Sequence, residues 1–422
     1  MVRRRRFAAA LVALALVGAA CGSDSSGGPI ASGGPSETVG DAPSAVEPTP
    51  MDADASETDT EVTAGTDDGA SAATIRRTAD GVPHIVAEDL GGLGFGYGYA
   101  FAEDQACSLI DMIVQVRSER ARWHGAGPDD RYLHADLVYA ALGIMDTAQT
   151  EYAALDPDLA QLVDGYAAGF DAYLDEVGPD GLNGWCAGAP WVGPITPVEL
   201  VAYYKSLALR ASIDPLIDYI AIATPPVTEA SERGDDTATP NADSEDAWAE
   251  LGAADSGLAS NGWAIGPDRT ADGTSMIVGN PHFPWEGALR FYEVQLTIPG
   301  RLDVYGASLL GVPVVNIGFN EHVAWSHTVS AGSRFTAYTL DLVEGDPTRY
   351  VYGDETREFE QRTASVEVLQ SDDSISTVEQ TLWFSHYGPV LDFPGIGWTN
   401  TTTLTLRDAN ADNDEIVEQW FL

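Results

Sequence analysis

The feature that most constrains this chain is a change of hydrophobic pattern at Ser260. Ahead of that residue, apolar side chains recur at steps of three and four residues, the spacing of one face of an α-helix. Beyond it, apolar and polar side chains alternate, the spacing of a half-buried β-strand. The stretch 225–259 between the two halves is acidic and poor in apolar residues. The sequence therefore predicts a helical region and a strand-rich region, joined by a polar segment that ends at Ser260.

Folded structure is predicted to begin near Thr74. Two short runs, 73–78 and 84–87, flank the turn Ala79-Asp80-Gly81 and predict a hairpin. The glycine-rich stretch 91–104 is not followed by the Gly-Lys-Ser/Thr of a phosphate loop. We therefore interpret it as a place where two elements approach closely.

Three helices are predicted in the first half of the chain. They span 106–123, 156–174 and 196–207; the second begins at Asp156-Pro157 and the third at the capping box Thr196-Pro197-Val198-Glu199. Strands are predicted in the second half at 292–298, 304–306, 312–318, 322–329, 335–342, 365–369, 377–384 and 401–406. Because no helical pattern separates these strands, the sheets should be largely antiparallel, as in the α+β class.

The N-terminal segment 1–21 has the pattern of an export signal. Arg3-Arg4-Arg5-Arg6 precedes the apolar run 7–17, which is too short to span a bilayer as a helix. Cys21 directly follows small residues and so resembles a bacterial lipoprotein cleavage site, which implies a lipid on Cys21. The protein is then expected on the outer face of the cell membrane. The alternative is an ordinary secretory signal and a secreted or periplasmic protein.

The charge balance excludes some partners. The chain has 65 acidic and 21 basic residues and a formal net charge of -44, so it should repel nucleic acid and anionic lipid headgroups. Much of this acidity lies in 22–73, which contains no Lys or Arg and is rich in Ser, Gly, Pro and Thr. Such a segment cannot bury enough apolar surface to fold, and we expect a disordered acidic stalk. The membrane is therefore expected as a partner only through the lipid anchor.

Ser260 is the candidate nucleophile. A serine hydroxyl reacts poorly until a base takes its proton, and an α-amine on the same residue can be that base. The pKa of a free α-amine is about 7.7 to 8.0, so part of it is neutral near pH 7. This chemistry requires that the bond between Ala259 and Ser260 be cut.

A family resemblance supports this interpretation. The stretch that begins with Ser260-Asn261 resembles the start of the β chain in the penicillin acylase family of N-terminal nucleophile hydrolases. The resemblance is closer to the acyl-homoserine lactone acylase and aculeacin A acylase branch, and it covers roughly residues 74–422. The motifs that carry it are Gly279-Asn280-Pro281-His282-Phe283-Pro284-Trp285, Arg290-Phe291-Tyr292, Gly306-Ala307-Ser308-Leu309-Leu310-Gly311 and Trp325-Ser326-His327-Thr328-Val329-Ser330.

The resemblance implies a division of the chain. Residues 74–228 correspond to a mostly helical α chain, 229–259 to an excised spacer propeptide, and 260–422 to the N-terminal part of a β chain that we expect to continue further. The implied fold is a four-layer αββα sandwich with two largely antiparallel sheets and the nucleophile strand in its central layers. The α and β chains are expected to remain together as a heterodimer.

The resemblance also assigns site residues. It implies a hydrogen-bonding histidine at His282, which is 22 positions after Ser260, and a backbone N–H that stabilises the oxyanion at Val329. Phe283, Val329 and Trp420 match positions that line the acyl pocket. Family members carry a second oxyanion donor, an asparagine, and an arginine near the amine, both further along the β chain than Leu422.

Two cysteines remain after the signal, Cys107 and Cys186. They lie in surroundings where related acylases place cysteines, so a disulfide is favoured, with a buried free thiol at Cys107 as the alternative. Some penicillin acylases bind calcium through acids shortly after the position of Val329, but Gly332-Ser333-Arg334-Phe335 stand there. We therefore expect no metal and no cofactor.

The resemblance implies a self-processing zymogen that hydrolyses the amide bond of small N-acyl compounds. Acyl-homoserine lactones or acylated lipopeptides are the favoured substrates, which would connect the protein to quorum quenching or antibiotic biosynthesis. One alternative is a penicillin side-chain acylase. An alternative of another class is a tethered solute-binding lipoprotein, which predicts strands and helices alternating along the whole chain. A serine esterase is excluded because no Gly-x-Ser-x-Gly elbow occurs.

Overall fold

The structure is a computed structural model in which part of the chain is described. These residues are 72–210, 212–226, 247, 251, 259–287, 289–330, 332–411, 413, 415, 418 and 419, together with the backbone of 58–63. The predicted signal 1–21 with Cys21, most of the predicted stalk, most of the predicted spacer and Trp420 lie outside them.

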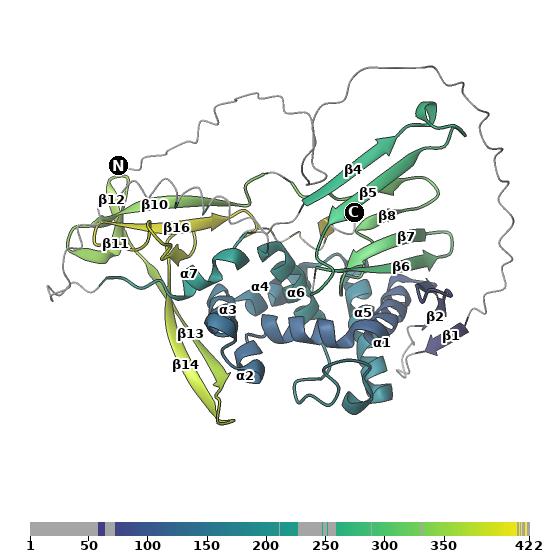
Figure 1. The fold of residues 1–422 in the computed structure, drawn as a ribbon, viewed down its shortest axis with the longest axis horizontal. Helices are drawn as coiled ribbons and strands as arrows, with labels where there is room; N and C mark the ends of the chain where they lie inside the picture. The colour runs from purple at the N-terminus through teal and green to yellow at the C-terminus, as the bar shows by residue number, and fades with distance from the viewer. Residues whose placement is uncertain are drawn as a thin grey trace, which may run out of the picture. The chain divides into compact units, whose positions relative to one another are not determined.

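The first half of the described chain is mostly helical (Figure 1). Its helices are α1 (Leu90–Val116), α2 (Arg120–His124), α3 (Arg131–Leu142), α4 (Ile144–Ala154), α5 (Pro157–Val177), α6 (Pro197–Leu209) and α7 (Ile217–Ala221), with 3-10 turns η1 (Pro128–Asp130), η2 (Pro179–Gly181), η3 (Asp214–Leu216) and, further on, η4 (Pro267–Arg269). Two of the predicted helices begin where expected. The Asp156 side chain caps α5, and Thr196 and Glu199 form both hydrogen bonds of the capping box of α6.

The predicted helix at 106–123 was wrong in its bounds. Helix α1 starts sixteen residues earlier, where the Asp89 side chain accepts a 2.7 Å hydrogen bond from Gly92 N–H. It ends before Ser118, whose φ of 59° lies in the left-handed region. The predicted helix did not extend over the glycine-rich stretch 91–104, where tertiary packing overrides the cost of glycine in a helix interior.

Glycines let α1 and α5 pack with their backbones in contact. A Cβ atom at Gly98 would lie 2.0 Å from the carbonyl oxygen of Tyr166, and one at Gly94 would lie 2.2 Å from that of Leu162. In the other direction, a Cβ at Gly169 would lie 1.9 Å from the carbonyl oxygen of Phe95. The predicted close approach of two elements at this stretch is therefore confirmed.

The strands lie at both ends of the described chain. They are β1 (Thr58–Thr63), β2 (Ala72–Arg77), β3 (Pro83–Ala87), β4 (Ala259–Ile265), β5 (Met276–His282), β6 (Phe291–Ile298), β7 (Leu302–Leu309), β8 (Ile317–Phe319), β9 (Ala324–Trp325), β10 (Phe335–Val343), β11 (Asp346–Tyr352), β12 (Glu355–Glu358), β13 (Glu360–Leu369), β14 (Ile375–Phe384), β15 (Val390–Leu391) and β16 (Thr402–Asp408). The described strands form a seven-stranded sheet in the order β1-β2-β3-β6-β7-β8-β9, a five-stranded sheet in the order β12-β11-β10-β16-β15, and the pairs β13-β14 and β4-β5.

The pairing is antiparallel, as predicted, with one exception. Strand β3 runs parallel to β6, with His84 opposite Gln295. This pair joins the N-terminal hairpin β2–β3, which was predicted from its turn, to the strands that follow Ser260. The described residues thus form an α+β fold.

Two predicted strands are shorter than expected. Of 312–318 only β8 is extended, because Gly311 has a φ of 73° and Val312 N–H donates to Leu309 O in a turn. Of 322–329 only Ala324–Trp325 is a strand. The Asn320 side chain accepts hydrogen bonds from the backbone N–H groups of His322 and Val323, which fixes a turn at the start of that segment.

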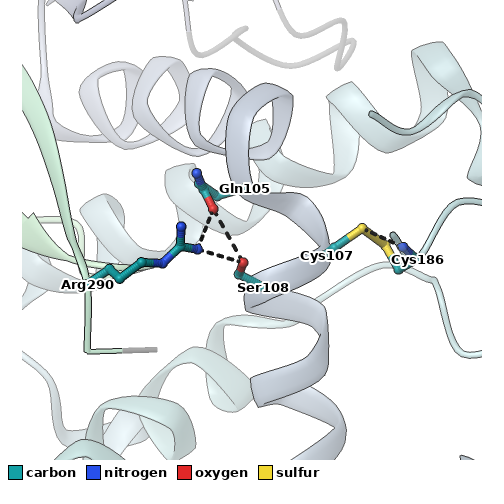
Figure 2. Close-up of a disulfide and its surroundings, with 5 residues drawn as sticks. All are labelled: Gln105, Cys107, Ser108, Cys186 and Arg290. Carbon is teal, nitrogen blue, oxygen red and sulfur yellow. Dashed lines mark hydrogen bonds between the residues drawn. A yellow bond between two sulfur atoms is a disulfide. The ribbon is translucent and has the colours of Figure 1, made fainter. Parts of the chain in front are cut away.

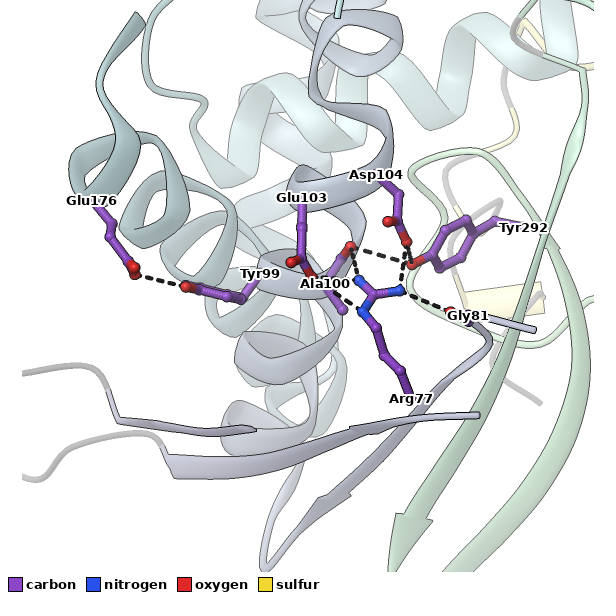
Figure 3. A network of polar contacts seen from close by, with 8 residues as sticks. All are labelled: Arg77, Gly81, Tyr99, Ala100, Glu103, Asp104, Glu176 and Tyr292. Atoms are coloured by element: carbon purple, nitrogen blue, oxygen red, sulfur yellow. Dashed lines mark hydrogen bonds and ion pairs between the residues drawn. The ribbon is translucent and has the colours of Figure 1, made fainter. Parts of the chain in front are cut away.

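An arginine network joins the first strands to α1 and β6 (Figure 3). Arg77 on β2 bonds Glu103 at 2.6 Å and Asp104 at 2.9 Å, both on α1. Tyr292 on β6 donates a 2.6 Å hydrogen bond to the same Asp104 carboxylate and also contacts Ala100 O at 3.2 Å. Residues on both sides of Ser260 thus share one polar network.

The larger core cluster contains two residues of the predicted spacer. Ala247 and Leu251 are 7% and 1% exposed, and both are helical. These two residues of the acidic segment are packed into the core, which its composition did not predict.

Candidate active site

The candidate nucleophile lies on the hairpin of β4 and β5. Ser260 is opposite Pro281 in the antiparallel register, and Ala259 is opposite His282. Residues paired across antiparallel strands point to the same face of the sheet, and successive residues point to opposite faces. The side chains of Ser260 and His282 therefore lie on opposite faces of the hairpin.

The Ser260 hydroxyl contacts the bond that the sequence predicts to be cut. Its Oγ donates a 2.6 Å hydrogen bond to the carbonyl oxygen of Ala259. Oγ, Cβ, Cα and the amide nitrogen of Ser260, together with the carbonyl carbon of Ala259, are the five atoms that close into a ring when the hydroxyl attacks that carbon. The nucleophile is thus adjacent to the carbonyl group of its own peptide bond.

His282 lies among asparagine side chains. The amide nitrogens of Asn261 and Asn280 are 3.0 and 3.1 Å from its Nε2. Both amide nitrogens are donors, so they can donate only to an Nε2 atom that carries no proton. Asn261 and Asn280 are paired across the hairpin, on the same face as His282.

The face of the hairpin that carries Ser260 packs against the segment that leads to Val329. A Cβ atom built on Gly262 would lie 3.6 Å from the Thr328 side chain, and one on Gly279 would lie 2.8 Å from Ser326 Oγ. The structure thus brings the Ser326 to Thr328 segment, which directly precedes Val329, to the nucleophile's face.

Two of the predicted pocket residues are described. Val329 is partly exposed and follows β9, while Phe283 follows β5 and has its ring centroid 5.3 Å from that of Phe291. Trp420, the third predicted pocket residue, lies outside the described residues.

Sequence reasoning missed Asn261, Asn280 and Ser326 as possible site residues. Ser326 Oγ is buried and has no hydrogen-bond partner among the described residues. A signal was available for the two asparagines. Asn280 and His282 are two residues apart, so a strand at this position places both on one face, and its pairing with the strand after Ser260 adds Asn261.

The two cysteines form a disulfide, with Cα atoms 5.4 Å apart and a sequence separation of 79. It joins α1 to the loop after η2. Among the described residues there is no group of three or more His, Cys, Asp or Glu side chains placed to hold a metal ion. The helices described also include none with the length and apolar character needed to cross a membrane.

The sequence was compared with models of known protein families. The sequence profile of the penicillin amidase family matches residues 72–422. The chain belongs to this family. The match spans the helical region, the predicted spacer and the strands that follow Ser260, so it covers the region over which the resemblance was expected.

Two proteins named as acylases match over most of this chain. The acyl-homoserine lactone acylase PvdQ of Pseudomonas fluorescens is 40% identical over 356 residues, which are 83% of this chain and 45% of that protein. The aculeacin-A acylase of Actinoplanes utahensis is 37% identical over 362 residues, which are 84% of this chain and 45% of that protein. The chain therefore spans about half the length of the relatives it matches.

Among solved structures, the thermostable penicillin G acylase of Alcaligenes faecalis matches with 23% identity. The match covers 38% of this chain and 28% of that chain, with a TM-score of 0.33. A score this low does not define a shared arrangement of elements.

Proposed function

We propose that this penicillin amidase family member is a self-processing N-acyl amidohydrolase with Ser260 as its nucleophile. The single observation that carries the proposal is the 2.6 Å contact between Ser260 Oγ and the carbonyl oxygen of Ala259. It puts the hydroxyl beside the peptide bond whose cleavage would create the catalytic amine.

Cleavage proceeds by an acyl shift. Ser260 Oγ attacks the carbonyl carbon of Ala259, the C–N bond breaks, and the hydroxyl proton ends on the freed amine. The resulting ester between Ala259 and Ser260 is hydrolysed by water. The products are a carboxylate on Ala259 and a free α-amine on Ser260, as the N-terminal serine mechanism requires.

Hydrolysis of the substrate uses the same hydroxyl as nucleophile, and the α-amine that cleavage has freed now acts as its base. The α-amine takes the proton of Ser260 Oγ as the oxygen attacks the acyl carbonyl, and the backbone N–H of Val329 stabilises the oxyanion. The amine of the substrate leaves with the proton, and water then hydrolyses the acyl ester on Ser260. One oxyanion donor of this kind contributes roughly 2.7 to 4 kcal/mol to lowering the barrier.

The proposed substrates are acyl-homoserine lactones or acylated lipopeptides. The printed names of the relatives support this choice, since they are acylases of acyl-homoserine lactones and of aculeacin A. In the proposed pocket, Phe283 and Val329 supply apolar walls, with Trp420 proposed as a third from its sequence position alone, and each buried CH₂ of an acyl chain contributes about 0.8 kcal/mol.

The proposal extends to the arrangement of layers and to the division of the chain. We assign the four-layer αββα sandwich, with 74–228 as α chain, 229–259 as spacer and the residues from Ser260 onward as β chain in a heterodimer. Support comes from the face of the β4–β5 hairpin opposite Ser260, where Trp263, Ile265, Met276 and Val278 are between 36% and 52% exposed. An apolar sheet face of this kind is one that a further layer covers. Export and a lipid on Cys21 remain part of the same proposal.

The experiment is a substrate comparison with the full-length protein. Purified protein is incubated with a long-chain acyl-homoserine lactone, an acylated lipopeptide and a phenylacetyl penicillin, and the released amine is quantified. Release from either of the first two, lost in Ser260→Ala, supports the proposal. Release from the penicillin alone would favour the side-chain acylase, and no release from any of the three would overturn the assignment.

A further inference from the structure

A small cavity lies beside the disulfide, on the side where α1 faces the chain after β5. Its volume is about 190 Å³, and it is lined by Ser108, Asp111, Met112, Trp185, Gly287 and Arg290. Ser108, Asp111 and Met112 occupy one face of α1, at three- and four-residue spacing. A water molecule occupies about 30 Å³ of liquid volume, so the cavity suits a small organic molecule rather than a long chain.

The guanidinium group of Arg290 is held in this cavity by neutral acceptors (Figure 2). Its Nη2 donates to Gln105 Oε1 at 2.9 Å and to Ser108 Oγ at 3.2 Å, and its Nε donates to Gly287 O at 3.2 Å. Gln105 is the residue at which α1 departs from helical geometry, with φ of −140° and ψ of 19°. The break in the helix thus provides the amide that fixes Arg290.

Arg290 lacks an acidic partner within the described part of the chain. All its hydrogen bonds there are to neutral groups, although the protein has 65 acidic and 21 basic residues. Arg77, Arg117, Arg120 and Arg301, by contrast, all pair with carboxylates. A guanidinium group has five N–H donors, and the two on Nη1 have no hydrogen-bond partner among the residues that the structure describes. One positive charge is therefore fixed in the cavity without a counter-charge on it.

The other walls limit which anion fits. Asp111 lines the same cavity, but its carboxylate is already bound to Arg120 and lies 3.7 Å from His124. A doubly charged phosphate would be repelled by Asp111, whereas a single carboxylate can reach Arg290 and keep a neutral or cationic group towards Asp111. Met112 and Trp185 provide apolar surface for the carbon skeleton next to the carboxylate.

We propose that this cavity binds a small carboxylate through Arg290, with an apolar or aromatic group of the ligand against Met112 and Trp185. Two sources share this chemistry: an α-amino acid, whose ammonium group would face Asp111, and a simple carboxylic acid. The site is separate from the reaction at Ser260 and does not depend on it.

The test measures binding by calorimetry to full-length Ser260→Ala protein, so that catalysis plays no part. Three probes differ by one group each: L-phenylalanine, 3-phenylpropanoate and 2-phenylethylamine. Saturable binding of at least one of the two carboxylates, with none of the amine, is expected. Tighter binding of phenylalanine would identify amino acids as the source, and tighter binding of phenylpropanoate would identify simple acids.

Arg290→Gln should weaken binding at least tenfold, since a charge-assisted hydrogen bond is lost. The matched control is Arg301→Gln, an arginine whose side chain is 50% exposed and pairs with Asp158 away from the cavity; it should leave the affinity unchanged. If Arg290→Gln does not fold, Trp185→Ala decides, because Trp185 is 66% exposed and its loss should leave the fold intact. The proposal is overturned if neither carboxylate binds, or if the folded cavity variants bind as tightly as the parent protein.

Discussion

The Nε2 atom of His282 lies 3.0 Å from the amide nitrogen of Asn261, the residue next to Ser260. This contact links the candidate nucleophile strand to the histidine on the partner strand, although the Ser260 and His282 side chains point to opposite faces. His282 can therefore act on the backbone nitrogen of Ser260, which cleavage would turn into the α-amine, by way of Asn261. It does not lie on the face of the hairpin that carries Ser260 Oγ.

Asn261→Ala tests this arrangement. Loss of one of the two amide donors should free the imidazole to rotate and lower the rate of amide hydrolysis about tenfold, the equivalent of one hydrogen bond of roughly 1.4 kcal/mol. The measurement is kcat for the acyl substrate, with Asn183→Ala, an exposed asparagine, as control. An unchanged kcat in Asn261→Ala would show that the contact has no catalytic role.

Gly98→Ala tests the backbone contact between α1 and α5. A Cβ atom at Gly98 would lie 2.0 Å from Tyr166 O, so the two helices must separate, and the free energy of unfolding should fall by about 3 kcal/mol or more. Gly193→Ala is the matched control, since a Cβ there meets nothing within 4 Å, and its effect should stay within about 0.5 kcal/mol. Urea denaturation measures both. Equal effects of the two substitutions would contradict the packing described.

The disulfide between Cys107 and Cys186 closes a long loop, with a sequence separation of 79. Its removal should lower the free energy of unfolding by about 4 kcal/mol, because a loop of this length gains much entropy in the unfolded chain. Cys107→Ala, Cys186→Ala and the double variant should therefore unfold at similar denaturant concentrations, close to that of reduced wild-type protein. Additive losses in the double variant would show that the thiol positions contribute by packing instead.

The buried carboxyl group of Asp136 should make stability depend on pH. Burial raises its pKa from 3.8 to about 7, although one oxygen accepts a 2.7 Å hydrogen bond from Ala121 N–H. The folded state thus holds the proton more tightly than the unfolded state, so the contribution of Asp136 to stability is largest at low pH and declines as pH rises towards about 7. The slope is at most about 1.4 kcal/mol per pH unit.

Asp136→Asn removes this titration. Denaturation at about pH 5 and about pH 8 should show wild type losing up to roughly 3 kcal/mol relative to the variant. Asp268→Asn, at a carboxylate that is 83% exposed, should keep the wild-type dependence. Parallel curves for wild type and Asp136→Asn would mean that this carboxyl group stays ionised throughout.

Local signals predicted much of the fold. The caps at Asp156 and Thr196 determined where α5 and α6 begin, and alternation predicted β6, because these patterns depend only on neighbouring residues. The start of α1 was missed because its glycines are required only by the close contact with α5. A local sequence pattern contains no information about that contact. Helices α3 and α4 also went unpredicted.

For the candidate site, the sequence indicated which residues to consider but not how they are arranged. Motifs made Ser260, His282 and Val329 candidates, but they did not show that His282 lies on the face opposite Ser260, since that depends on the register of β4 with β5. The burial of Ala247 and Leu251 was likewise hidden, because two buried residues four positions apart are too few to give a periodic signal.

The central claim is that the bond between Ala259 and Ser260 is cut to create the catalytic amine. N-terminal sequencing and intact mass of the purified full-length protein test it most directly, with Ser260→Ala as the comparison. We predict a fragment that begins with Ser260-Asn261-Gly262-Trp263 in the wild type and an unbroken chain at this position in the variant. A fully active wild-type enzyme without any fragment that begins at Ser260 would contradict the account.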